Sequence, residues 1–455
     1  MKRGEKCRAV RAALSAPLCL IAALLTACQP TPTEEVVVQR VELNVLGQEE
    51  QPAPAGPVLA DLLPLPERVD RPEQTLGGAA VTIAAQVIQP NAQACPVVEV
   101  RQTTFSRERL RELTERFCPG AELYHYWQPT QRELLEQRAA QLEYGDDSED
   151  SRIMLDWLDE TIPTAPLTEE RVPFDWSEEL PATYAMVCAV RGPEEAVSSF
   201  HLGPQKFVYF RTRNHVVYSE SIYTAQEFER FPAPSVGKDE AQAAAEEVLA
   251  QLGLTDAMLL SKTERMVELY ANVPLRVGYM FTFTPGYGGL ASVPPEGYTA
   301  SETVPPSVVA PWDISWLYVF VDEEGIAQIG WSEPVAFGEV LEEDAALLPF
   351  EQMLERAEQQ LLYLYAADGL PGGGQTDAGE IRTRIEVTRI SLVRGCIQLR
   401  DERDVGQSVP LWRFDYLEHY GEDADPLEHV LYLDARTGAY VEPRMDMETL
   451  MQLTS

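Results

Sequence analysis

Several residue types and motifs are scarce in this sequence, and each scarcity narrows what the chain can do. The 455 residues include five histidines and seven cysteines. There is no HExxH, GxSxG, Walker-type loop or CxxC pair, so the local motifs of zinc peptidases, serine hydrolases, P-loop NTPases and zinc sites are missing. Only 36 Lys and Arg stand against 73 Asp and Glu, for a formal net charge of −37. Such a surface repels phosphate, which argues against a nucleic-acid partner and against electrostatic contact with anionic lipid.

The N-terminus has no apolar run long enough to cross a membrane comfortably. Its apolar stretch, Leu14–Leu25, has about a dozen residues, which is the length of a signal-peptide core, and a basic segment precedes it. Directly after it, Leu25, Thr26, Ala27 and Cys28 match the bacterial lipobox, in which the cysteine thiol carries a diacylglyceryl group. We therefore expect residues 1–27 to be a signal peptide. Lipid on Cys28 would anchor the protein to the extracytoplasmic side of the cell membrane; the alternative is an ordinary secretory signal with an accidental cysteine.

The cysteines beyond the lipobox allow one disulfide. A strand is expected over 97–104 and a helix over 107–117, and a helix that folds back over its strand would bring Cys118 towards Cys95. An extracytoplasmic location permits that bridge. The alternative is that both are buried free thiols.

The composition changes along the chain and suggests five parts. After the signal peptide, residues 28–66 are rich in Pro, Glu and Gln and indicate a flexible tether. Strand and helix patterns then predict an N-terminal α+β domain over 67–180 and two α+β modules over 181–345 and 346–455. The expected fold class is α+β, with small antiparallel sheets that each pack with helices. A Pro- and Gly-rich stretch, 285–311, is long enough to be either a functional loop or a disordered one.

The two modules resemble each other in spacing. Asp322 and Asp434 each begin a short turn that a glycine closes, at Gly325 and Gly438, as in a β-hairpin with a bulge. The two aspartates lie 112 positions apart, and so do the expected helix starts near 238 and 350. This equal offset indicates an internal duplication.

Parts of the sequence resemble two known families. The second hairpin, Val430–Gly438, resembles the closing hairpin of PepSY-type domains, which implies tandem small sheets with a helix and no catalytic residues. Such domains act as peptidase-inhibiting propeptides or through protein contact in membrane-anchored regulators. The lipobox, the segment Pro96–Val100 followed by Phe105-Ser106, and the segment Phe320–Ile326 together resemble an uncharacterised family of clostridial surface lipoproteins. That second resemblance implies a cellular location and a domain architecture, but no activity.

Other polar and aromatic clusters have ordinary explanations. One polar cluster is expected to be a loop rather than a metal site; it comprises Asp415, His419, Glu422, Asp423, Asp425 and His429. Four tryptophans fall on or beside expected strands and are expected in the sheet cores rather than on a ligand-binding platform; these are Trp312, Trp316, Trp331 and Trp412.

The sequence therefore predicts a lipid-anchored extracytoplasmic protein that binds or regulates a protein partner at the cell surface. It predicts no enzyme activity, no cofactor and no metal. Two alternatives remain: a surface hydrolase with a site under the 285–311 loop, since catalytic triads form in space rather than in sequence, and a protein that binds the cell wall.

Overall fold

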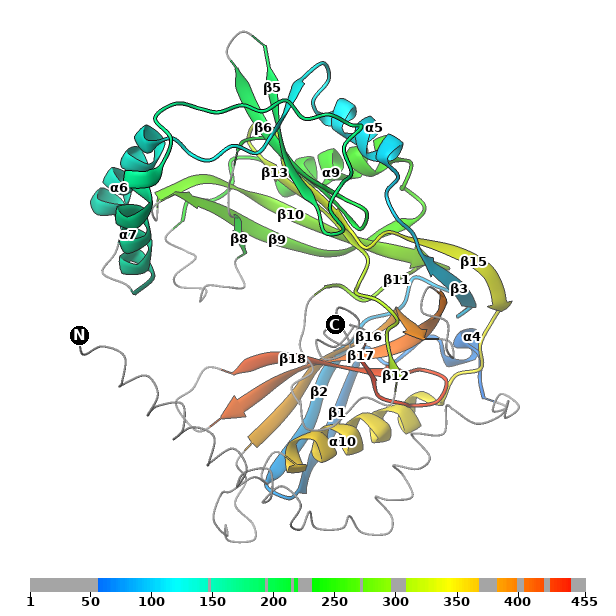
Figure 1. The fold of residues 1–455 in the computed structure, drawn as a ribbon. Helices are drawn as coiled ribbons and strands as arrows, with labels where there is room; N and C mark the ends of the chain where they lie inside the picture. Colours follow the sequence, from blue (N-terminus) through cyan, green and yellow to red (C-terminus); the bar gives the residue numbers. More distant parts are fainter. Residues whose placement is uncertain are drawn as a thin grey trace, which may run out of the picture. The chain divides into compact units, whose positions relative to one another are not determined.

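The structure is a computed structural model that describes residues 56–145, 149–192, 195–213, 217–219, 231–270, 273–295, 308–367, 383–398, 405–420 and 426–442. Leu25, Thr26, Ala27 and Cys28 lie outside the described residues, as does the tether up to residue 55. The described part is mixed α+β and mostly β, with two sheets built mainly from antiparallel strands (Figure 1). With seven and ten strands, these sheets are larger than the small ones that the sequence predicts.

The seven-stranded sheet has the order β1-β2-β16-β17-β3-β15, with β18 beside β17. Its strands are β1 (Arg68–Leu76), β2 (Ala79–Val87), β3 (Val97–Gln102), β15 (Val335–Glu342), β16 (Thr383–Gln398), β17 (Val405–Tyr420) and β18 (Leu427–Asp434). Helix α10 (Phe350–Ala367) lies against this sheet (Figure 1). The helix buries Met353, Leu354, Ala357, Leu361 and Leu364 in the core, as their three- and four-residue spacing predicts.

The ten-stranded sheet has the order β4-β5-β6-β7-β14-β13-β10-β9-β8, with β11 beside β10. Its strands are β4 (Glu122–His125), β5 (Ala185–Arg191), β6 (Ala196–Gly203), β7 (Lys206–Phe210), β8 (Val217–Ser219), β9 (Met258–Tyr270), β10 (Val273–Tyr287), β11 (Leu290–Ala291), β13 (Trp316–Asp322) and β14 (Gly325–Ser332). Its core includes apolar side chains from α5 (Arg107–Phe117) and α9 (Lys238–Leu252). Helix α9 ends at Gly253, whose φ of +73° suits glycine.

Three short elements lie outside these two sheets and the helices of their cores. Helix α4 (Leu59–Leu62) precedes β1 and buries Leu59 in the core of the seven-stranded sheet. Strands β12 (Val308–Val309) and β19 (Val441–Glu442) pair in parallel.

One order of elements occurs twice in the chain. Helix α9 precedes the antiparallel pair β9–β10, and β13 then pairs with β10. Helix α10 likewise precedes the antiparallel pair β16–β17, and β18 then pairs with β17. A turn led by a buried aspartate follows both third strands: Asp322 pairs with Arg211, and Asp434 pairs with Arg436. This repeated order agrees with the internal duplication that the sequence indicates.

The two sheets do not follow the boundaries expected at residues 180 and 345. The expected N-terminal domain is divided, because β1–β3 join the seven-stranded sheet while β4 and α5 join the ten-stranded sheet and its core. Strand β15 leaves the first module and pairs with β3. Periodicity along the chain predicts the individual strands, but it carries no information about distant strand partners.

A buried arginine, Arg394 on β16, connects the two sheets. Its side chain is fully buried and donates hydrogen bonds to Ser408 Oγ (2.8 Å), Ser408 O (2.8 Å) and Pro96 O (2.6 Å). Its guanidinium lies 5.6 Å from the ring centroid of Tyr287, at the end of β10. Its carbonyl accepts a hydrogen bond from Val293 N. Burial lowers the pKa of Arg394 to about 10, so this residue remains charged at neutral pH.

A second connection joins the end of β3 to the segment between β14 and β15. Thr103 donates through both N and Oγ1 to Pro334 O, and Gln102 Nε2 donates to Glu333 Oε2 at 2.7 Å. Glu333 N donates to Gln205 O, and Glu333 has a φ of +50°, an uncommon value for a residue other than glycine. Burial raises the pKa of Glu333 to about 7; the charge of Asp313 adds to the rise, while Gln102 and Lys206 oppose it.

We expect Arg394→Met to lower the free energy of unfolding by ~2–4 kcal/mol, because it leaves the buried carbonyls of Pro96 and Ser408 without their charged donor. Chemical denaturation of the full chain measures this change. Arg389→Met on the same strand is the matched control, because Arg389 is exposed; we expect a change within ~0.5 kcal/mol. Equal effects of the two substitutions would show that the buried arginine does not stabilise the connection.

We expect Glu333→Gln to stabilise the protein above pH 7 and to have little effect near pH 5. The folded-state pKa of about 7 lies above the ordinary value of 4.5. The folded protein therefore binds this proton more tightly than the unfolded chain, and the associated stability is lost as the pH rises through 7. Thermal unfolding of wild type and variant from pH 5 to pH 8 measures the difference. The exposed Glu339→Gln is the control, and a pH-independent difference for Glu333→Gln would contradict the assignment.

Candidate functional site

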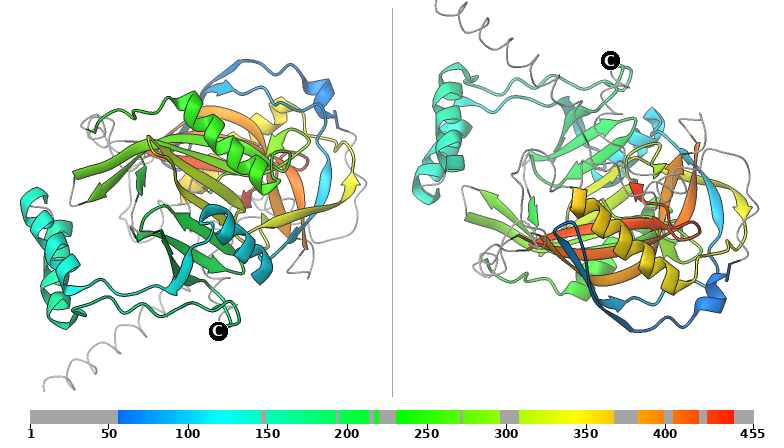
Figure 2. Two further views of the ribbon diagram at one scale, coloured as in Figure 1. Left: turned by 90° about the horizontal axis from the view of Figure 1, so that it is seen from above. Right: turned by 90° about the horizontal axis from the view of Figure 1, so that it is seen from below.

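Two antiparallel helices, α6 (Gln131–Tyr144) and α7 (Glu149–Thr161), form a helical hairpin (Figure 2). Helix α6 begins at Thr130 with a capping box: Thr130 Oγ1 accepts from Glu133 N, and the Glu133 carboxylate accepts from Thr130 N at 2.7 Å. Arg138 pairs with Asp159 at 2.6 Å across the two helices. The 3₁₀ helix η1 (Ile162–Thr164) follows α7.

The base of the helical hairpin is attached to the edge of the ten-stranded sheet through Trp127, which is 3% exposed. The guanidiniums of Arg213 and Arg171 lie 4.9 and 5.1 Å from its ring centroid. Arg213 also donates to Trp127 O at 3.0 Å and pairs with Glu133 at 3.2 Å. Burial alone would raise the pKa of Glu133, but hydrogen bonds from Thr130 and the charge of Arg213 outweigh it and lower the pKa. The base is therefore held by both packing and charge.

The rest of the helical hairpin leaves its apolar side chains in solvent. Within the two helices only Leu134 and Leu158 are buried apolar residues, and neither belongs to the cores described on the sheets. Of the 14 large apolar side chains exposed in the described residues, six lie on these two helices: Leu135, Leu142, Tyr144, Ile153, Met154 and Trp157. Apolar side chains gathered in this way typically mark a contact surface.

The clustering on α7 is the most pronounced. Ile153 is 59% exposed, Met154 39% and Trp157 46%. Tryptophan is enriched among the residues that dominate protein–protein binding energy. Trp157 lies apart from the four tryptophans on or beside the expected strands. The four-residue spacing of Ile153 and Trp157 predicts that they share one face of a helix. It does not predict whether another part of the protein covers that face.

The four tryptophans singled out from the sequence do not form an exposed platform. Trp312, Trp331 and Trp412 are buried, and Trp316 is half-buried. Trp412 packs against Phe350 of α10.

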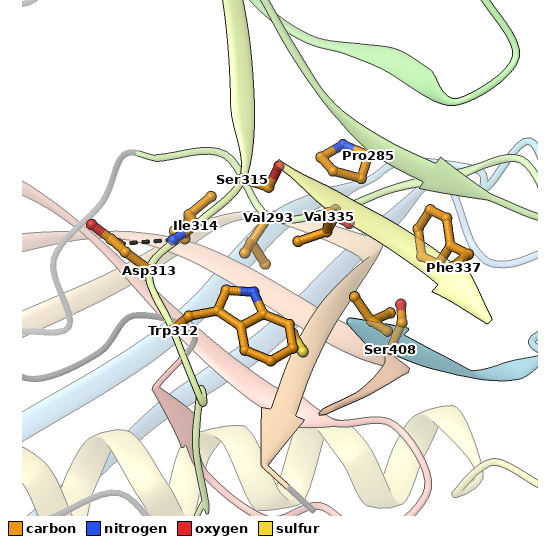
Figure 3. Close-up of a pocket in the computed structure, with 12 residues that line it drawn as sticks. Pro285, Val293, Trp312, Asp313, Ile314, Ser315, Val335, Phe337 and Ser408 are labelled. Atoms are coloured by element: carbon orange, nitrogen blue, oxygen red, sulfur yellow. Dashed lines mark hydrogen bonds between the residues drawn. The ribbon is translucent and has the colours of Figure 1, made fainter. Parts of the chain in front are cut away.

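A cavity of about 40 Å³ lies at the two ends of the 285–311 segment (Figure 3). Pro285, Val293, Trp312, Phe337 and Ser408 are among its lining residues, and residues 296–307 lie outside the described part. This volume accommodates water molecules rather than a substrate.

The described side chains that line the cavity offer no evident nucleophile with a neighbouring base. Figure 3 shows the Asp313 side chain turned to Ile314 N, which donates to Asp313 Oδ1 at 2.8 Å. Burial raises the pKa of Cys396 to about 12, so its thiol stays protonated and is a weak nucleophile. The residues described around the cavity include no histidine to act as a general base.

The Cys95–Cys118 disulfide allowed by the sequence is not formed in the structure, where both cysteines are free thiols. Cys95 lies in the core of the seven-stranded sheet and Cys118 in that of the ten-stranded sheet. The reason is that helix α5 does not fold back over β3 but packs in the other core. Burial raises the pKa of Cys95 to about 12.

The polar cluster around His419 is divided by the strand register. His429 lies opposite Tyr416 and pairs with Glu418 at 2.8 Å. Glu418, which is 1% exposed, also accepts a hydrogen bond from Tyr365 of α10 at 3.0 Å. Asp415 pairs with Arg413; Glu422, Asp423 and Asp425 lie outside the described residues. No group of three or more His, Cys, Asp or Glu residues in the described chain is arranged to hold a metal ion.

No helix among the described residues is both long enough and apolar enough to cross a bilayer.

Comparisons with known proteins give a structural likeness only. No family model matches the sequence, and no curated protein matches it. The chain is similar to a solved structure of an uncharacterised protein from Eubacterium rectale, with 12% sequence identity and a TM-score of 0.45, over 83% of this chain and 94% of that one.

Proposed function

We propose that the protein is an extracytoplasmic lipoprotein that acts by binding another protein, with no chemistry of its own. The observation that carries this proposal is the helical hairpin α6–α7, which is held at its base and leaves Ile153, Met154 and Trp157 in solvent. Burying one such side chain against a partner contributes ~1.5–3 kcal/mol.

The anchor and the architecture enter the proposal as supporting features. The lipobox ending in Cys28 would keep the protein at the membrane surface, and the 28–66 segment would separate the folded part from the bilayer. We further propose that α9 with its strands and α10 with its strands are PepSY-like modules in tandem. The repeated order of a helix followed by three paired strands supports this assignment.

We expect Cys28→Ala to release the protein from the membrane fraction, because the substitution removes the thiol that carries the lipid. Cell fractionation with a tagged full chain measures the distribution, and labelling with a radioactive fatty acid reports the lipid directly. Cys188→Ala is the control, since Cys188 lies within the described fold. Membrane retention and unchanged labelling of the Cys28→Ala protein would contradict the anchor.

The binding surface is tested by site-specific photocrosslinking on intact cells. A photoreactive residue at position 154 should capture one defined protein, identified by mass spectrometry, whereas one at position 427 should not. Leu427 is a suitable control because it is 50% exposed on a strand far along the chain. We expect Trp157→Ala to reduce capture at position 154 by at least tenfold, the loss typical of an anchoring aromatic residue. Leu427→Ala should leave it unchanged.

The other outcomes distinguish the alternatives. Equal capture at positions 154 and 427, or capture unaffected by Trp157→Ala, would contradict binding through the helical hairpin. Recovery of wall fragments instead of a protein would favour wall binding. Hydrolysis of peptide or glycan substrates that a substitution beside the cavity, such as Ser408→Ala, abolishes would favour the hydrolase.

A further inference from the structure

The outer face of α7 combines apolar and acidic side chains. Glu149, Ile153, Asp156, Trp157 and Glu160 are all exposed and recur at spacings of three and four residues, which places them on one face of the helix. Ser151 and Leu158 are buried and lie on the opposite face. The two exposed apolar side chains therefore stand within a row of carboxylates.

One cation, Arg152, lies three and four residues from Glu149 and Asp156 on the same helix, so these carboxylates are only partly offset. Arg138 is engaged by Asp159, and Arg213 by Glu133. Within the described residues, Glu149, Asp156 and Glu160 make no ion pair. Helix α7 as a whole has five acidic residues and one arginine. The face therefore carries a net negative charge around its apolar centre.

We infer that the partner of this surface is an amphipathic helix whose apolar side chains are flanked by lysine or arginine. This inference rests on the proposed function and specifies the partner of the same site. The face from Glu149 to Glu160 is about 16 Å long at 1.5 Å per residue, so it can pair with roughly three turns of a helix laid along it. The partner's apolar side chains cover Ile153 and Trp157, and its cations lie against Asp156 and Glu160.

The same charges argue against a bilayer as the occupant. Helices that lie in a membrane interface typically carry lysine and arginine on their polar face, and anionic headgroups attract them. Helix α7 carries the opposite charge. A protein helix with basic flanks is therefore the occupant that fits both the apolar centre and the acidic row.

The experiment measures binding of a synthetic helical peptide, with a leucine stripe flanked by lysines, to the full chain carrying Cys28→Ala. Fluorescence anisotropy gives the affinity, and a matched peptide with glutamates in place of the lysines gives the background. We expect the double variant Asp156→Asn/Glu160→Gln to weaken binding of the lysine peptide by about twofold to fivefold for each neutralised carboxylate. Added salt should reduce the wild-type affinity towards that of the variant.

The control variant removes the same number of negative charges from a surface outside the helical hairpin. Glu339→Gln/Glu428→Gln removes two exposed carboxylates outside the helical hairpin and should leave the affinity unchanged. If Trp157→Ala abolishes binding but the Asp156/Glu160 variant behaves like this control, charge complementarity is wrong and the apolar surface stands. If neither variant has an effect, both the inference and the binding surface are wrong. Trp157-dependent binding to phosphatidylglycerol vesicles would overturn the inference in favour of a membrane.

Discussion

A buried charge, the guanidinium of Arg394, lies where the two sheets meet. Arg394 has no exposed surface and donates to the carbonyls of Pro96 and Ser408 and to the hydroxyl of Ser408. These partners belong to the segment before β3 and to β17, while the Tyr287 ring beside the guanidinium belongs to β10 of the other sheet. A buried guanidinium is costly unless its donors are satisfied. The three hydrogen bonds of the Arg394 side chain hold β16 to β17 and to the segment before β3, while Nη1 has no hydrogen-bond partner in the described structure. The guanidinium meets the ten-stranded sheet through the Tyr287 ring.

The helical hairpin, in contrast to the buried Arg394, is well packed only at its base. Its base resembles the interior, with Trp127 buried beside two arginines and Glu133. Beyond this base, Leu134 and Leu158 are the buried apolar residues described in the two helices. Helices of this length are marginal in water without packing. A partner that covers Ile153 and Trp157 would supply burial that the chain itself does not provide.

The sequence predicts local structure well and distant pairing poorly. The apolar faces of α9 and α10 follow from three- and four-residue spacing, and both aspartate-led turns occur where their residues predict them. The division of the N-terminal segment between two sheets, by contrast, depends on which strand edges meet, and no local pattern records that.

The sequence does not predict the candidate site, because exposure of a helix face also depends on distant parts of the chain. The spacing of Ile153 and Trp157 shows that they share a helix face, but exposure depends on whether another element covers that face. The cysteine pair shows the same limit: Cys95 and Cys118 are close in sequence and lie in different cores.

The two buried turn aspartates differ in where their positive partner comes from. Asp434 pairs with Arg436, two residues further along the same turn. Asp322 instead pairs with Arg211, which follows β7, and lies 3.6 Å from Arg276 of β10. The later copy of the repeat thus has its counter-ion within the turn itself, whereas in the earlier copy the positive partners of the aspartate come from β10 and from Arg211, which lies outside the repeated elements. If the repeats arose by duplication, their two turns no longer depend on the same contacts: the C-terminal unit alone would keep Arg436 beside Asp434, whereas the N-terminal unit alone would lose Arg211 and keep Arg276 beside Asp322.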